Sequence, residues 1–222
     1  MADATVLIEE IRQDLQPVTE QLLRHPYVQA LQDGKIGREK LSLFAGEQYY
    51  IIASDLKSVA YLVSRFGSAP SRDFFLGILH GERAAWDALL TFADGLGLSE
   101  AQLRAHEPLA GAHAYTCYMA WLALYASDAE IAAAYLVNFP AWGQNCGRLS
   151  QILKERFGLG EKEVAFFELF ANPPATFEAN ALSVIQHGLD RGIEPRLIQR
   201  AARLLQAYEL MYWDTLYGAS SP

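Results

Sequence analysis

Residues 128–157 read DAEIAAAYLVNFPAWGQNCGRLSQILKERF, and this stretch decides the fold. It predicts a long helix that is capped by Asp128 and ends at Gly158. Between Ile131 and Phe139 the stretch is apolar on nearly every face, which is typical of a helix in the centre of a bundle or at a subunit interface. Pro140 removes one backbone hydrogen bond, so we expect a kink there.

The same helical period extends along the chain in both directions. In residues 4–24, for example, apolar side chains recur at steps of three and four. Between the predicted helices lie turns rich in Gly and Pro, and we predict no strand because no stretch alternates apolar and polar residues. Helices are predicted over residues 4–24, 26–32, 38–66, 72–96, 100–106, 115–125, 129–157, 161–170, 176–190 and 195–217. Long helices joined by short turns indicate one all-α, single-domain helical bundle over residues 1–222.

Composition narrows the function classes. Of the 222 residues, 51% are hydrophobic and 20% charged, and the formal net charge is -8. An acidic chain with scattered Lys and Arg predicts no nucleic-acid partner, because phosphate backbones are bound by clustered cations. No run reaches the roughly 20 apolar residues that span a bilayer, and no signal peptide is evident at the start. We therefore expect no membrane segment and a cytoplasmic protein.

Two helices place a carboxylate among aromatic residues. Glu47 and Tyr50 lie three residues apart and share a helix face, and Glu209 and Tyr212 repeat this spacing near the end of the chain. Aromatic rings beside a carboxylate can bind a flat heterocycle that carries an amine. Alternatively, each glutamate sits at the rim of an ordinary core face. The residues around Pro140 also allow two interpretations. Asn138, Phe139, Trp142 and Asn145 either form a binding site or surround a purely structural kink.

Metal and nucleophile motifs are weak. His80 and Glu82 are two residues apart and so point in different directions on a helix, and neither HExxH nor ExxH occurs. Cys117 and Cys146 form neither a CxxC pair nor a disulfide framework, and no histidine adjoins them. We predict no metal, no cofactor and no cysteine nucleophile.

Four segments resemble the TenA (thiaminase II) family: HPYVQAL with the following DG at residues 25–34, EQYY at 47–50, AYTCYM at 114–119 and YELMYW at 208–213. Other segments are similar to the related PqqC family, namely YY at 49–50 with DLK at 55–57, and HGE at 80–82 with GLS at 97–99. Both resemblances imply a haem-oxygenase-like fold. The TenA resemblance covers most of the chain in order.

The TenA resemblance implies roles for particular residues. It implies that Glu47 holds the amine of an aminopyrimidine, that Tyr50 and Tyr115 line its pocket, and that Glu209 is the catalytic acid or base. At the position of the family's nucleophilic cysteine this chain has Asn138, and Trp142 stands one turn later where the family has a tyrosine. Without a thiolate the usual covalent displacement has no attacking group.

Three functions therefore stay open. The first is binding or hydrolysis, at a C–N bond, of a thiamine-related aminopyrimidine or similar small heteroaromatic, with Tyr212, Trp142 and Asn138 also in the pocket. The second is a PqqC-like or di-iron oxidase, and the third a ligand-binding protein without catalysis. We also expect a homodimer or homotetramer, because we predict that four aromatic residues are exposed and form a subunit interface: Phe74, Phe75, Phe166 and Phe167.

Overall fold

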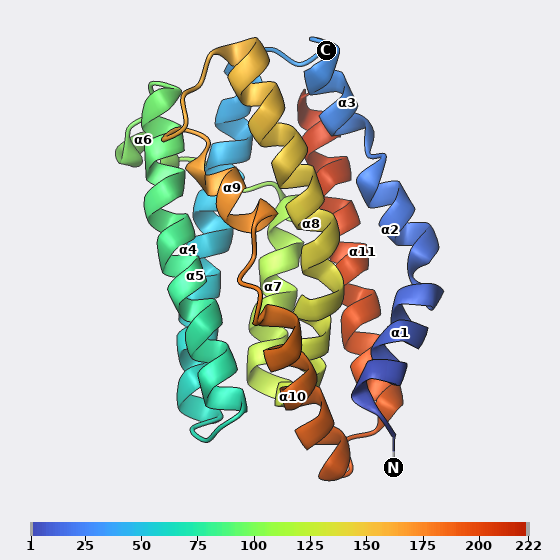
Figure 1. Ribbon diagram of the computed structural model, residues 1–222. Coiled ribbons are helices and arrows are strands. Elements are labelled where there is room, and N and C mark those ends of the chain that lie inside the picture. Colours follow the sequence, from blue (N-terminus) through green and yellow to red (C-terminus); the bar gives the residue numbers. More distant parts are fainter. Residues whose placement is uncertain (1, 221–222) are drawn as a thin grey trace.

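The computed structural model describes residues 2–220, and within that part of the chain every regular element is helical (Figure 1). Eleven α-helices and one short 3-10 turn, Arg38–Lys40, follow one another. The helices are α1 Ala4–Asp14, α2 Gln16–Leu23, α3 Pro26–Gln32, α4 Leu41–Arg65, α5 Ser71–Gly95, α6 Glu100–Arg104, α7 Ala110–Tyr125, α8 Asp128–Phe157, α9 Ala165–Ala171, α10 Phe177–Asp190 and α11 Pro195–Ser220. The prediction of an all-α bundle is confirmed.

Helix α8 is continuous from Asp128 to Phe157 even though it contains Pro140. Its N-cap is Ser127 rather than the predicted Asp128, because Ser127 and Glu130 form a reciprocal capping box. Gly158 ends the helix in the left-handed region, with φ of 69°.

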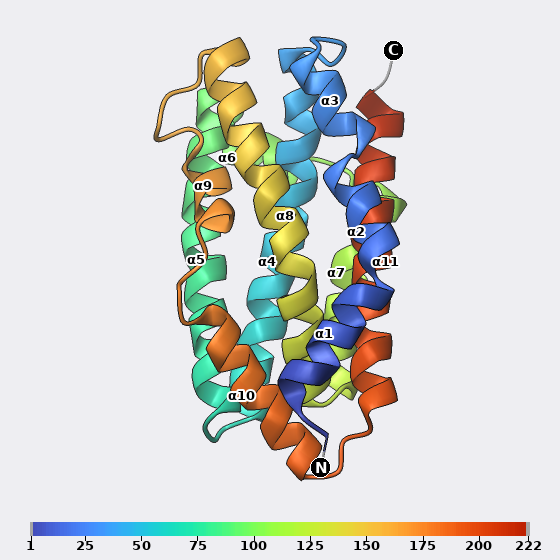
Figure 2. The same cartoon turned by 45° about the vertical axis from the view of Figure 1, so that its right-hand side comes forward.

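The long helices run along a common axis, and α1 to α3 follow one side of the bundle beside α11 (Figures 1 and 2). Helix α4 packs against α5 and α7, whereas α8 packs against α9, α10 and α11. Two clusters of buried apolar side chains fill the interior, and α8 contributes to both. Tyr115 of α7 packs against both clusters, which places it between the two halves of the core.

Four aromatic residues that we predicted at a subunit interface are buried within the chain itself. Phe74 and Phe75 of α5, and Phe166 and Phe167 of α9, are at most 4% exposed. The prediction that they are exposed is wrong, because α9 and α10 fold back over α5 and α8 and cover them. The oligomeric state remains a prediction that these residues no longer support.

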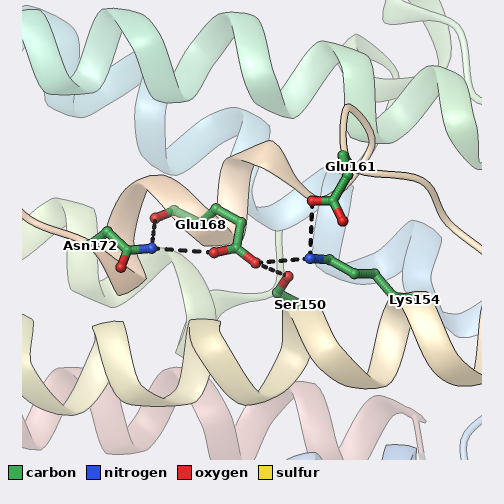
Figure 3. A network of polar contacts seen from close by, with 5 residues as sticks. All are labelled: Ser150, Lys154, Glu161, Glu168 and Asn172. Atoms are coloured by element: carbon green, nitrogen blue, oxygen red, sulfur yellow. Dashed lines mark hydrogen bonds and ion pairs between the residues drawn. The ribbon is translucent and has the colours of Figure 1, made fainter.

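Helix α9 is held against α8 by a close backbone approach and a polar network. A Cβ atom at Gly143 of α8 would lie 2.5 Å from the carbonyl oxygen of Phe170, so only glycine permits this contact. Figure 3 shows Glu168 of α9 accepting hydrogen bonds from Ser150 and Lys154 of α8 and from Asn172. The network fixes the end of α9, and with it the position of Phe170.

No helix within residues 2–220 is both long enough and apolar enough to cross a membrane. The long helices carry polar residues throughout, and their buried faces are taken up by one another.

Candidate active site

A cavity with about 500 Å³ of empty space, which includes open solvent, lies inside the bundle, where α4 and α5 face α8 and α11. Nine of its lining residues carry groups that can form hydrogen bonds, the indole N–H of Trp142 included, and the other four are apolar. The lining consists of Gln48, Ile51, Ile52, Asp55, Glu82, Tyr115, Tyr135, Asn138, Phe139, Trp142, Phe170, Glu209 and Tyr212. Its mixture of apolar walls with a few polar groups is typical of a small-molecule site.

Glu209 of α11 is the centre of a buried hydrogen-bond network. The carboxylate is 2% exposed, and the indole Nε1 of Trp213 donates to its Oε1 over 3.1 Å. The Nδ2 of Asn138 donates to the other oxygen, Oε2. Burial raises the pKa of Glu209 to about 7, although the bonds from Trp213 and Asn138 act in the opposite direction. At neutral pH this carboxyl group can therefore both give and accept a proton.

Asn138 is held in a fixed orientation by hydrogen bonds to three neighbours. Its Nδ2 donates to Glu209 and also to Oε1 of Gln206, at 2.8 Å. Its Oδ1 accepts from the hydroxyl of Tyr115 at 3.2 Å, and Gln206 in turn donates to Thr19. Asn138 thus orients the Glu209 carboxylate, and an amide at this position cannot act as the nucleophile that a thiolate would be.

One wall of the cavity is aromatic, and it contains two predicted residues. The rings of Trp142 and Tyr212 lie 5.9 Å apart in an edge-to-face arrangement, and Trp142 also contacts Phe170 in this way. The hydroxyl of Tyr212 accepts a 2.8 Å hydrogen bond from Nε2 of Gln48 on α4. The structure brings Tyr115, Asn138, Trp142, Glu209 and Tyr212 together on the lining of one cavity, and their roles toward a ligand stay predictions.

Glu47 and Tyr50, in contrast to the prediction, do not line the cavity. Glu47 is 1% exposed, and its Oε1 accepts from the backbone N–H of Leu109 and lies 2.9 Å from Nε2 of His106. The hydroxyl of Tyr50 donates to the backbone carbonyl of Arg104. One helical residue corresponds to a turn of about 100°, so Gln48 faces the cavity while Glu47 joins α4 to the segment before α7.

The cavity also contains a pair of carboxylates that we did not predict from the sequence. Asp55 of α4 accepts a 2.5 Å hydrogen bond from the hydroxyl of Thr116, and Glu82 of α5 adjoins it. Burial raises the pKa of both groups, and the nearby charge of Asp55 raises that of Glu82 further. The spacing of Gln48, Ile52 and Asp55 at four and three residues was the available signal, since it places them on one helix face.

Both cysteines lie outside the cavity lining. Cys117 is exposed, whereas Cys146 is fully buried, and burial raises the pKa of its thiol well above its usual value. Cys146 is therefore protonated and unsuited to nucleophilic attack. Within residues 2–220, no three His, Cys, Asp or Glu side chains gather in a way that could hold a metal ion.

The all-helical bundle defines a protein of the haem-oxygenase-like fold. Within this class the chain belongs to the TENA/THI-4/PQQC family, whose model matches residues 12–219. The resemblance predicted from four sequence segments is thereby confirmed.

Two characterised relatives match part of the chain. An aminopyrimidine aminohydrolase of Halalkalibacterium halodurans is 30% identical over 122 residues, which are 54% of this chain and 54% of the relative. A 4-aminobenzoate synthase of Chlamydia muridarum is 29% identical over 119 residues, or 51% of this chain and 50% of the relative. The chain thus spans about half the length of the characterised relatives it matches.

Solved structures share the fold at low sequence identity. A TenA homologue from Pseudomonas syringae has a TM-score of 0.79 at 14% identity, with 95% of this chain and 92% of the other covered. Haem oxygenase-1 from the cyanobacterium Synechocystis has a TM-score of 0.70 at 16% identity, covering 96% of this chain and 93% of that one. These likenesses establish the architecture of the bundle.

Proposed function

We propose that this protein binds a small heteroaromatic amine, such as a thiamine-related aminopyrimidine, in the cavity and hydrolyses one of its C–N bonds. The observation that carries the proposal is Glu209, a buried carboxyl group that opens onto an aromatic cavity and has a pKa of about 7. Family membership and the similarity to an aminopyrimidine aminohydrolase support the same class of substrate.

The reaction is a direct hydrolysis that needs no covalent enzyme intermediate. Glu209 in its protonated form donates its proton to the leaving amine nitrogen as the C–N bond breaks. Water forms the new C–O bond at the same carbon and gives a proton to the Glu209 carboxylate, which regenerates the acid. The amine leaves as ammonia and the product carries a hydroxyl group, so atoms and protons balance.

The remaining cavity residues bind and orient the ligand. The rings of Trp142 and Tyr212 offer an apolar face to a flat heterocycle. Gln48, whose amide already donates to Tyr212, has its side-chain carbonyl left to accept a hydrogen bond from a ring amine. Holding ring and carboxyl group together supplies the orientation that hydrolysis needs.

Binding and turnover can be tested separately. We expect an aminopyrimidine with an aminomethyl substituent to raise the melting temperature of the wild-type protein, because a ligand that binds the folded state alone stabilises it. Release of ammonia from the same compound then reports turnover. The matched control is Glu10→Gln, at an exposed position of α1, which should change neither result.

Other outcomes favour the alternatives. Stabilisation without ammonia release, unchanged in Glu209→Gln, indicates a ligand-binding protein without catalysis. An oxidase is indicated instead if protein produced in iron-supplemented medium retains about two iron ions per chain by elemental analysis. Absence of stabilisation by any aminopyrimidine or thiamine analogue contradicts the proposal.

A further inference from the structure

The cavity contains acidic groups and no opposite charge. Asp55, Glu82 and Glu209 all line it, and its lining includes no Lys, Arg or His. Asp55 and Glu82 are at most 8% exposed, and the structure provides Asp55 with the hydroxyl of Thr116 as its hydrogen-bond donor. Burying carboxylates without a cation is unfavourable, so this part of the cavity is suited to a positively charged group that comes from outside the protein.

A buried hydroxyl group without a partner points to the same place. Tyr135 of α8 is 1% exposed and lines the cavity, and its hydroxyl oxygen has no hydrogen-bond partner. The charges of Asp55 and Glu82 act on this hydroxyl, so it lies near the carboxylate pair. Buried hydroxyls in proteins nearly always have a partner, and a ligand that also contacts the pair can supply it.

Glu82, one member of the carboxylate pair, lies where the cavity meets an open groove. A second hollow, with about 1080 Å³ of empty space that includes solvent, runs between α5 and the segment 169–180. Glu82, Phe139 and Phe170 line both this groove and the cavity. A molecule that passes from the groove to Glu209 therefore passes the carboxyl group of Glu82.

We propose that Asp55, Glu82 and Tyr135 form a second subsite, which binds an ammonium group on a substituent of the ligand while the ring lies between Trp142 and Glu209. The inference rests on the proposed function, because it assumes that the ligand occupies this cavity, and it narrows the substrate class to compounds with two basic groups. Asp55 and Glu82 accept hydrogen bonds from the ammonium group, and the Tyr135 hydroxyl accepts a third.

The test compares ligands that differ in one charge. Two pairs serve as probes: an aminopyrimidine with an aminomethyl or a hydroxymethyl substituent, and benzylamine with benzyl alcohol. Affinities are measured by calorimetry for wild type, for Glu82→Gln and for the control Asp87→Asn. Asp87 lies on the same helix, is 57% exposed and pairs with Arg83.

In the wild type we expect each amine to bind about tenfold or more tightly than its alcohol, as charge-assisted hydrogen bonds imply. Glu82→Gln should bring this ratio close to one, and Asp87→Asn should preserve it. Equal binding of amine and alcohol by the wild type, or a preference that survives Glu82→Gln, overturns the subsite. If only benzylamine shows the Glu82-dependent preference and neither pyrimidine binds, the subsite stands and the proposed substrate class is wrong.

Folding of the variant must be checked separately. Because Glu82 is buried without a cation, the amide in Glu82→Gln should be tolerated, and circular dichroism should show an unchanged helical signal. If this variant misfolds, Tyr135→Phe provides the second measurement. It removes only the hydroxyl, and it should lower the preference for the amine while leaving the affinity for the alcohol unchanged. No change in that preference contradicts the proposal.

Discussion

Asn138 of α8 donates a hydrogen bond to Glu209 of α11, so the two residues that bracket the candidate site are joined directly in the core. The Tyr115 hydroxyl donates to Asn138 on one side, and the Trp213 indole donates to Glu209 on the other. The chain of contacts fixes the carboxyl group at the cavity wall. Under the proposed function, these bonds would hold Glu209 as an acid–base group in a chain that has Asn138 where the TenA resemblance implies a nucleophilic cysteine.

Asn138→Ala should lower turnover more than ligand affinity. The substitution removes the amide that donates to the Glu209 carboxylate and thus a bond that favours its charged form. We therefore expect the pKa of Glu209 to rise further and the alkaline limb of the pH–rate profile, where the protonated acid is lost, to move to higher pH. Steady-state kinetics across pH 5 to 9 would reveal this shift, and an unchanged profile would show that Asn138 does not tune Glu209.

Glu47→Ala should reduce stability and leave ligand affinity nearly unchanged. Glu47 is buried, accepts a hydrogen bond from the backbone N–H of Leu109 and contacts the ring of His106. Its loss leaves these two partly buried groups without this partner. A loss of about 1–3 kcal/mol in the free energy of unfolding is typical of such a change. Urea denaturation measures the first effect and calorimetry the second. A large loss of affinity with unchanged stability would instead support the ligand contact predicted from the sequence.

Stability should fall as pH rises from mildly acidic to mildly basic. The pKa values of Asp55, Glu82 and Glu209 are raised by burial, so the folded state binds protons that the unfolded state has already released. Stability that is present below pH 4 is therefore lost progressively as the pH passes through about 7 to 8. Thermal melts from pH 5 to 8 should show the decline, and Glu82→Gln should flatten it. A rise in stability over this range would contradict the assigned burial of these groups.

Gly143→Ala should displace α9 and impair the site. The new methyl group would meet the carbonyl oxygen of Phe170, and backbone yields less readily than a flexible side chain. We expect a destabilisation of roughly 1–3 kcal/mol, which is common for overpacking, together with weaker ligand binding because Phe170 moves. Gly147→Ala is the matched control on the same helix, since its added carbon would make ordinary contact at 3.6 Å. Equal effects of the two variants would disprove the steric explanation.

The sequence was sufficient to predict the helices and the half of the site that α8 and α11 provide. Asn138 follows an apolar stretch of α8 and Glu209 lies among aromatic residues of α11, so in both places a polar side chain is conspicuous. On α4 the pattern was ambiguous, because Glu47 and Gln48 are adjacent polar residues and a step of one residue changes the helix face. The spacing of residues along α4 does not show which of the two side chains points into the cavity. In the folded protein Glu47 accepts a hydrogen bond from Leu109, so Gln48 is the one that lines the cavity.

The carboxylate pair and the buried phenylalanines could not be predicted for a related reason. Asp55 and Glu82 come from different helices and meet only because α4 packs along α5. Phe166 and Phe167 belong to the short helix α9, and the return of α9 onto α8 and α5 buries them. Both features depend on contacts between distant segments, which periodicity does not report.

The most direct test of the proposed acid–base role of Glu209 is the rate of ammonia release from an aminomethyl-substituted aminopyrimidine, measured at neutral pH for wild type and Glu209→Gln. We expect the wild type to turn over the compound and the variant to release ammonia about 100-fold or more slowly, as is typical when a general acid–base group is removed. The variant should still bind the ligand. Turnover at the wild-type rate in a folded Glu209→Gln protein would contradict the proposed role.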